Sequence, residues 1–334
     1  MPRVGARAYS ELTRAWGSPG QALRAVVPAN GQRQYRDRAR SVMRDGEACG
    51  ARLLLIGDDA YPEVLHELVD PPPFLFVLGD LSVLDRPAVA IVGTRRSTLY
   101  GERTTDAIAT ALATAGACIV SGMARGIDGV AHRAALRCKG VTAAILGTGV
   151  DVAYPVGHRG LHRAIIERGV VISEFPCGSG AERASFPRRN RIIAALARAT
   201  IVIEAGEKSG ALITAEHALD LNRDIGVVPG PVDSPQCVGS NRWMQTGAYP
   251  ILDAGDALMM LRLDDPVVRS AAVPELRGDE RAIWITLAAG ATPTDLLSEA
   301  TGLPPSRALA AVTGLEMAGL VETLPTGELR RRRG

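Results

Sequence analysis

Aromatic residues are scarce in this sequence and make up 4% of its 334 positions. Hydrophobic residues still reach 46%, with alanine and valine prominent among them, so a sizeable core can be built from small side chains. No apolar run is long enough to span a bilayer, and residues 1–20 lack the pattern of a secretory signal peptide. We therefore expect a cytoplasmic protein without membrane contact.

Cysteine–histidine clusters are also absent. The five cysteines stand singly, without any C-x-x-C pair, so the sequence offers neither a structural zinc site nor a disulfide framework, and we expect buried free thiols. The histidines within helical patterns have no metal-ligand spacing, and we interpret them as surface or packing residues: His132, His158, His162 and His217. We predict no metal site.

Charge of one sign does not dominate, because the net charge is only +2. A surface for nucleic acid must therefore be a local patch. The dinucleotide fingerprint G-x-G-x-x-G does not follow the first strand of the predicted sheet, and no Walker A or G-x-S-x-G motif occurs. These absences argue against a dehydrogenase, an ordinary P-loop ATPase and a serine hydrolase. No catalytic set stands out, and we predict no cofactor.

Apolar runs that alternate with amphipathic helical patterns dominate the middle of the chain, from about residue 61 to residue 263. This alternation is typical of a parallel sheet covered by helices on both faces. We predict a doubly wound, Rossmann-like α/β domain. Its expected strands are Val89–Val92, Cys118–Val120, Thr142–Leu146, Val170–Ser173, Thr200–Ile203 and Ile225–Val228.

Smaller segments flank this domain. Residues 1–60 show short helical patterns, and we expect an incomplete helical domain, because either the start codon is misplaced or the domain is shortened. Residues 264–278 contain two prolines and few large apolar groups, as in a linker. Residues 279–334 show helix, helix, turn, helix and hairpin patterns, which predict a winged-helix domain. Thr292 and Pro293 are expected to begin its second helix.

The segments that follow the expected strands are rich in Gly, Ser, Thr and Arg. Ligands of open parallel sheets bind beyond the carboxyl ends of the strands, and these residue types contact phosphate oxygens. Gly147-Thr148-Gly149 is equally consistent with a tight turn between strand and helix. Asp128, Glu174, Glu204 and Glu216 are the candidates for a general acid or base, although Glu174 and Glu204 suit the orientation of arginines as well.

One helix start is unusual, because residues 185–191 place three arginines and an asparagine in its first turns. Cations are unfavourable at the positive end of a helix dipole, so an anion is expected nearby. A phosphate chain above the helix N-terminus would supply it. The alternative is a solvated cap in which the arginines pair with Glu174 or Glu182.

Several motifs resemble those of the DprA/Smf family in order and spacing. They are Ala90-Ile91-Val92-Gly93-Thr94-Arg95, Ser121-Gly122-x-Ala124-x-Gly126-Ile127-Asp128, Phe186-Pro187-x-Arg189-Asn190-Arg191, Lys208-Ser209-Gly210-x-Leu212-x-Thr214-Ala215, Val228-Pro229-Gly230 and Gly239-x-Asn241. The resemblance implies a single-stranded DNA-binding protein of natural transformation and recombination. Such a protein protects incoming strands, helps to load the recombinase RecA, dimerises, and is not an enzyme.

The resemblance also implies roles for individual residues. Arg95 would hold a phosphate, Phe186 would stack a base, and Arg189 would shape the pocket together with Arg191. The expected DNA-binding residues are Gly93, Thr94, Arg95, Ser121, Gly122, Arg125, Arg183, Phe186, Arg188, Arg189, Asn190, Arg191, Lys208, Ser209 and Gly210. The candidate dimer residues are Asn241, Met244, Tyr249 and Leu258.

Two rival functions follow from other stretches. The segment from Ser209 to Glu216 distantly resembles the phosphate loop of nucleotide phosphoribohydrolases, in which a glutamate acts in catalysis. A sequence-specific regulator would instead bind duplex DNA through Ser306, Arg307 and the terminal run Arg330–Arg333. The expected recognition helix over residues 306–318 holds mostly alanine, valine and leucine, which cannot distinguish base edges by hydrogen bonding.

Overall fold

The computed structural model describes residues 6–263, 276, 278–287, 292–318, 320–323 and 327–331. The chain divides into two compact units, residues 1–266 and residues 267–334, and we take them one at a time. The linker predicted at residues 264–278 lies mostly outside the described residues, as do Met1, Arg332 and Arg333.

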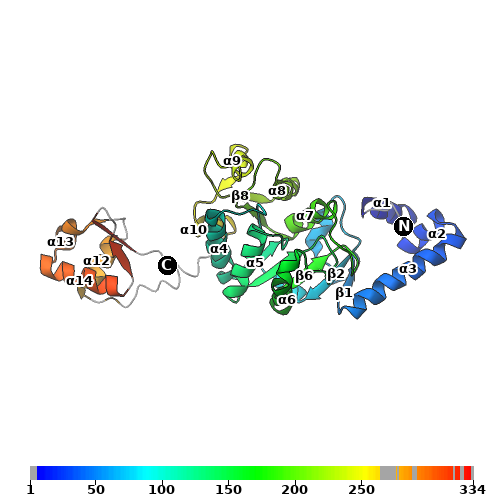
Figure 1. Cartoon of the computed structure of the whole chain (residues 1–334), viewed down its shortest axis with the longest axis horizontal. Coiled ribbons are helices and arrows are strands. Elements are labelled where there is room, and N and C mark those ends of the chain that lie inside the picture. The colour runs from blue at the N-terminus through cyan, green and yellow to red at the C-terminus, as the bar shows by residue number, and fades with distance from the viewer. Residues whose placement is uncertain are drawn as a thin grey trace. The chain divides into compact units, whose positions relative to one another are not determined.

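The first unit is built on a nine-stranded sheet of order β1-β2-β6-β5-β4-β3-β7-β8-β9. Figure 1 shows this unit, with β1 and β2 next to β6. All strand pairs from β6 to β9 in this order are parallel, which confirms the doubly wound fold. The expected strands agree with the structure to within one residue at each end. The parallel strands are β3 (Ala88–Val92), β4 (Cys118–Ser121), β5 (Val141–Ile145), β6 (Val170–Ser173), β7 (Ala199–Val202), β8 (Asp224–Val227) and β9 (Tyr249–Pro250).

The sheet begins earlier in the chain than residue 61, where we predicted the start of this domain. Strand β1 (Arg52–Leu55) lies in the segment predicted to be helical, and it pairs antiparallel with β2 (Phe74–Gly79), which pairs antiparallel with β6. Three consecutive leucines suit a helix as well as a strand, so pairing with β2 decides the conformation. The short 3-10 helices η1 (Glu63–Glu67) and η2 (Leu81–Asp85) follow β1 and β2.

Three helices precede β1, as the sequence predicted: α1 (Ala6–Trp16), α2 (Pro19–Val26) and α3 (Ala29–Ala48). Ser18 caps α2, since its hydroxyl accepts a hydrogen bond from the Gln21 backbone N–H at 3.3 Å. The last turn of α3 packs closely on the sheet. A Cβ added to Gly46 would lie 2.7 Å from Cε1 of Phe76, so glycine allows this approach.

Helices cover both faces of the sheet. One face carries α7 (Ser185–Leu196) and α8 (Gly210–Asp220). The other carries α4 (Leu99–Thr114), α5 (Ile127–Arg137) and α10 (Ala254–Met260), with α6 (Arg159–Arg168) toward β6. The remaining helical segments are η3 (Val156–His158) and α9 (Val238–Gln245). None of the described helices is both long and apolar enough to cross a membrane.

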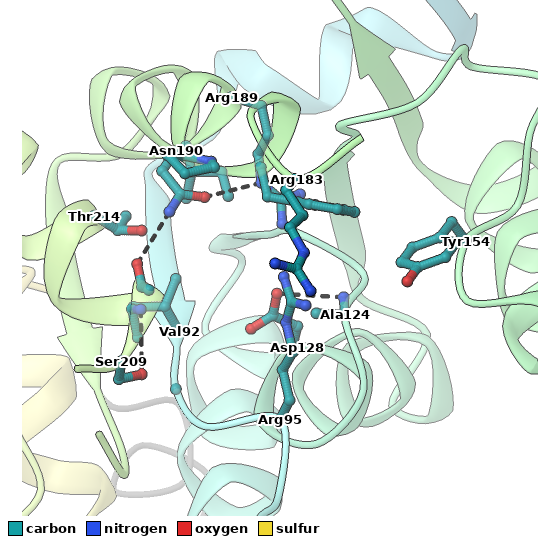
Figure 2. A pocket seen from close by; sticks show the side chains of 16 residues that line it. Val92, Arg95, Ala124, Asp128, Tyr154, Arg183, Arg189, Asn190, Ser209 and Thr214 are labelled. Atoms are coloured by element: carbon teal, nitrogen blue, oxygen red, sulfur yellow. Dashed lines mark hydrogen bonds between the residues drawn. The ribbon is translucent and has the colours of Figure 1, made fainter. Parts of the chain in front are cut away.

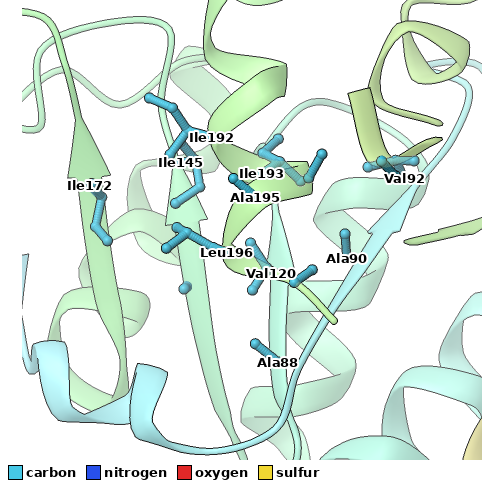
Figure 3. Packing of buried hydrophobic residues seen from close by; sticks show 14 of the residues in the cluster. Ala88, Ala90, Val92, Val120, Ile145, Ile172, Ile192, Ile193, Ala195 and Leu196 are labelled. Carbon is cyan, nitrogen blue, oxygen red and sulfur yellow. The ribbon is translucent and has the colours of Figure 1, made fainter. Parts of the chain in front are cut away.

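The second half of α7 anchors the helix to the sheet (Figure 3). Ile192 and Ile193 are at most 1% exposed, and each such isoleucine contributes about 1.5–3 kcal/mol by burial. This packing fixes the direction of the arginine-rich first half. The strand residues of the same cluster include Ala88, Ala90, Val92, Val120, Ile145 and Ile172.

The second unit has the helices and the sheet of a winged helix. Its helical segments are α12 (Gly278–Thr286), η5 (Thr294–Leu296), α13 (Leu297–Thr301) and α14 (Pro305–Met317), and its strands are β10 (Thr292–Pro293), β11 (Val321–Thr323) and β12 (Glu328–Arg331). The expected helix start at Thr292 is wrong, because Thr292 and Pro293 pair with β12 at the sheet edge. An edge position tolerates proline, which lacks the N–H of a ladder bond.

Candidate nucleic-acid interface

The loops that follow β3, β4, β5, β6 and β7 surround a pocket of about 540 Å³. They meet where the strand order reverses, since the chain passes from β3 to β6 on one side and returns to β7 on the other side of β3. Doubly wound proteins bind their ligands at this reversal. The pocket therefore lies where the fold favours a ligand site (Figure 2).

The structure brings one group of the predicted site residues together and leaves another outside the pocket lining. The first group is Gly93, Arg95, Arg183, Phe186, Arg189, Asn190, Ser209 and Gly210. The second group is Thr94, Ser121, Gly122, Arg125, Arg188, Arg191 and Lys208.

Phe186 makes two contacts through its ring. The guanidinium carbon of Arg95 lies 4.9 Å from the ring centroid, and the centroid of the Tyr154 ring lies 5.5 Å away at an interplanar angle of 38°. These side chains come from the segments after β3 and β5, so the fold assembles the stack from distant parts of the chain. Aromatic rings and arginine planes are the surfaces on which nucleic-acid bases stack.

Arg95 and Arg183 reach into the pocket from opposite sides (Figure 2). Both are exposed, and neither makes an ion pair with any residue that the structure describes. The same is true of Arg125 and Lys208, which lie outside the lining. Positive charges without a carboxylate partner are suited to phosphate groups.

Arg189 has a different role, because its side chain is only 3% exposed. Its Nη1 donates to the carbonyl of Gly122 at 2.7 Å and to the carbonyl of Ile145, and its Nε donates to Oδ1 of Asn190 at 3.0 Å. Burial lowers the pKa of Arg189 to about 10, so it remains charged at neutral pH. Arg189 thus connects α7 to the ends of β4 and β5. Its buried side chain lines the base of the pocket, which we call the pocket floor.

Two other predicted residues support this floor. A Cβ on Gly122 would lie 2.2 Å from Nη2 of Arg189, so only glycine leaves room for the guanidinium group. Asn190 donates from Nδ2 to the carbonyl of Gly210 at 3.0 Å, which joins α7 to the start of α8. The hydroxyl of Ser121 is buried and donates to the Ile91 carbonyl at 2.6 Å, so it is not available to a ligand.

Asp128 is a pocket residue that the sequence suggested only as a general acid or base. It lies at the start of α5 and is 6% exposed, with Oδ2 accepting a hydrogen bond from the Ala124 backbone N–H at 3.3 Å. Burial raises its pKa, while the charges of Arg189 and Arg95 act in the opposite direction. The pocket therefore contains one carboxyl group beneath its cations.

Arg188 and Arg191 do not reach the pocket. Arg191 is 4% exposed, and its guanidinium group contacts Glu174 at 2.7 Å and Asp70 at 3.3 Å. Arg188 contacts the same oxygen of Glu174 at 2.9 Å. Burial raises the pKa of Glu174, and the two arginines oppose that shift. Arg188 and Arg191 thus pair with Glu174, as the alternative for this helix start expected, but Arg191 and Glu174 are buried and do not form a solvated cap.

The four candidate dimer residues have different surroundings. Leu258 is 2% exposed and packs in the core of its own chain, so its proposed place in an interface is wrong. Asn241 forms two hydrogen bonds to the backbone of Gly230, at 3.1 and 2.9 Å. Met244 is partly buried, and Tyr249 of edge strand β9 is 42% exposed. Only Tyr249 of this set offers a large exposed apolar surface.

Tyr154 is an aromatic pocket residue that the sequence interpretation missed. Its position after β5 could have identified it, because an aromatic residue in a loop at the carboxyl end of a parallel strand is a candidate ligand contact. In the structure Tyr154 is 41% exposed and lines the pocket beside Phe186.

Fold and site together define a doubly wound α/β protein with a cationic, aromatic pocket and a winged-helix domain. Residues 52–262 match the family model of DNA recombination-mediator protein A, and residues 267–327 match the DprA winged helix domain. The chain belongs to the DprA/Smf family, as its motifs predicted. This is a family of DNA-binding recombination mediators, not of enzymes.

Two relatives show how much of the chain is shared. Protein Smf of Escherichia coli K12 is 36% identical over 291 residues, which cover 84% of this chain and 78% of that protein. Protein Smf of Synechocystis is 46% identical over 208 residues, which cover 61% of this chain and 52% of that protein. The present chain thus spans about half the length of the latter.

Two solved structures are similar to the sheet region. DNA processing protein A of Streptococcus pneumoniae has a TM-score of 0.61 and 39% identity, covering 63% of this chain and 74% of that one. DNA processing protein A of Helicobacter pylori, which was studied for its single-stranded DNA binding mode, has a TM-score of 0.58 and 30% identity. That match covers 64% of this chain and 98% of the other.

Proposed function

We propose that this chain binds single-stranded DNA in the pocket at the carboxyl ends of β3–β7. The observation that carries the proposal is the stack of Arg95 on Phe186, with Tyr154 beside it. Binding of single strands without sequence preference requires a basic groove and a stacking face. This pocket supplies both, and its similarity to a protein studied for single-stranded DNA binding supports the same use.

The proposal extends to a role in the cell. Bound strands are protected during DNA uptake and natural transformation and are passed to RecA, which the protein helps to load. The active form is a homodimer in the cytoplasm, and no cofactor takes part. Membership of the recombination-mediator family supports this role.

The rival functions find less support in the site. Glu216, the expected catalytic residue of a phosphoribohydrolase, is exposed on α8 and does not line the pocket. Arg307, which would enter a major groove, is held by Asp279 through two contacts at 2.6 and 2.7 Å. Arg330 pairs with Glu322. These cations of the winged-helix unit are already neutralised by carboxylates.

The test is fluorescence anisotropy with labelled single-stranded and double-stranded oligonucleotides over a series of salt concentrations. Four cations lack ion-pair partners near the pocket, so the slope of log affinity against log salt should be about −3 for a single strand. Arg95→Ala should weaken binding and reduce the magnitude of the slope by about 0.7. Arg188→Ala is the matched control, because Arg188 already pairs with Glu174.

A chain ending at Leu263 completes the experiment. If it retains tight single-strand binding, the site lies in the sheet-containing unit. A preference for duplex DNA that disappears in this truncation would place the binding in the winged helix and contradict the proposal. So would a slope near zero.

A further inference from the structure

Two thiols that lie 128 positions apart in the sequence touch in the structure. The Sγ atoms of Cys49 and Cys177 are 2.9 Å apart. Cys49 directly follows α3, and Cys177 lies in the loop between β6 and α7. The sequence pattern indicated only isolated thiols, because nothing in the spacing of single cysteines reveals a contact that the fold creates.

The surroundings hold this thiol pair in place. Cys49 Sγ also donates to the carbonyl of Gly46, at 3.2 Å in the last turn of α3. On the other side, the backbone N–H of Gly178 donates to both carboxylate oxygens of Asp151, at 2.9 and 3.0 Å. Hydrogen bonds therefore hold Cys49 to the last turn of α3 and hold Gly178, the residue after Cys177, to Asp151. The two thiols meet without any large movement.

The pair is also accessible, since both cysteines are partly exposed. Cys118 and Cys237 are buried, and Cys138 instead contacts the carbonyls of Thr110 and Ala135. No group of three or more histidine, cysteine or acidic side chains suited to a metal is found in the described part of the chain. The chemistry that remains for two touching, accessible thiols is oxidation to a disulfide.

We propose that Cys49 and Cys177 form a reversible disulfide that fastens helix α3 to the sheet when the protein meets a low-molecular-weight disulfide. The Cys49 thiolate attacks one sulfur of that oxidant, forms a mixed disulfide and releases one small thiol. Cys177 then loses its proton, attacks Cys49 Sγ and releases the second small thiol. The protein loses two electrons and two protons, and the oxidant gains them.

The environment of Cys177 suits this thiol to the second attack. Burial raises the pKa of the Cys177 thiol to about 12, and contact with Cys49 adds to this shift. A thiol that is protonated at neutral pH is a poor first nucleophile. Cys177 therefore acts second, when the mixed disulfide is already beside it.

The bond would restrain the N-terminal helices more than the DNA pocket. Helix α3 joins the sheet through its last turn, and the connection to β1 passes through Gly50 at φ +77°. A disulfide at Cys49 restrains this connection and links segments that lie 128 positions apart in the chain. The loop of Cys177 is already held by Asp151, so Arg183 and the pocket stay in place and single-strand affinity is unchanged.

The test treats the full-length protein with oxidised glutathione and maps its peptides by mass spectrometry. We expect a Cys49–Cys177 crosslink that dithiothreitol reverses and that Cys49→Ser and Cys177→Ser both abolish. Cys138→Ser is the control and should retain it. The crosslinked protein should melt about 5–10 °C higher than the reduced one.

The peptide map of the oxidised wild-type protein tests the proposal even if a serine variant folds poorly. Free thiols at both positions, or glutathione retained on Cys49 without a crosslink, would overturn the proposal. A crosslink that leaves the melting temperature unchanged would overturn the fastening of α3.

Discussion

Replacing Phe186 with alanine removes the stacking face from the pocket without changing its charge. Stacking of a base on an aromatic side chain contributes about 1–3 kcal/mol, which corresponds to about 5-fold to 150-fold in affinity. The guanidinium group of Arg95 also lies 4.9 Å from the centroid of this ring. Loss of the ring removes that contact too, so the loss of affinity should exceed about 5-fold. Anisotropy titration with a labelled single-stranded oligonucleotide measures the change.

The chain contains a matched control for this variant. The guanidinium carbon of Arg188 lies 5.4 Å from the ring centroid of Phe175, which is the same kind of contact outside the pocket lining. Both phenylalanines are partly buried. Phe175→Ala should therefore leave single-strand affinity unchanged, although both variants remove one ring from an arginine contact.

Salt dependence separates stacking from charge. Phe186→Ala removes no cation, so the slope of log affinity against log salt should equal that of the wild type. The reasoning would be refuted if Phe175→Ala weakened binding as much as Phe186→Ala, or if Phe186→Ala bound single strands as tightly as the wild type.

Three further predictions concern buried groups of the sheet-containing unit. Gly122→Ala should push the buried Arg189 off its carbonyl partners, with a loss of about 1–3 kcal/mol in the free energy of unfolding, measured by urea denaturation. Because burial raises the pKa of Asp128, acidification should protonate this carboxyl at a higher pH than an exposed carboxyl and strengthen single-strand binding. Asp128→Asn should bind tightly without this pH dependence in the same anisotropy assay. Burial lowers the pKa of His132 from 6.5 to about 3, so the folded protein binds fewer protons than the unfolded chain between these values. The free energy of unfolding should therefore fall as the pH is lowered through this window, and His132→Gln should show a smaller fall in urea titrations at several pH values.

Much of the fold could be predicted because hydrophobic periodicity is local information. Parallel strands buried on both faces appear as continuous apolar runs, and the helices between them show the helical period. Strand β1 was not predicted, because Arg52–Leu55 is too short to show a hydrophobic period. Its conformation depends on pairing with β2, which is a contact between distant residues. The pairing of Thr292 and Pro293 with β12 is likewise a contact between distant residues.

The location of the pocket could be predicted, but the surroundings of each arginine could not. Gly, Ser and Arg after successive strands indicate which edge of the sheet binds a ligand. Whether an arginine is free depends on distant carboxylates and carbonyls. Glu174 pairs with Arg188 and Arg191, Asp70 pairs with Arg191 as well, and the carbonyls at the ends of β4 and β5 hold Arg189, whereas Arg95 remains available.

The most direct test of the proposed DNA site is photocrosslinking of the full-length protein to a single-stranded oligonucleotide that contains 5-iododeoxyuridine. Mass spectrometry of the digested complex identifies the crosslinked side chain. We predict crosslinks to Phe186 or Tyr154, whose rings lie 5.5 Å apart in the pocket. Crosslinks confined to residues 278–331 of the winged-helix unit would contradict the account.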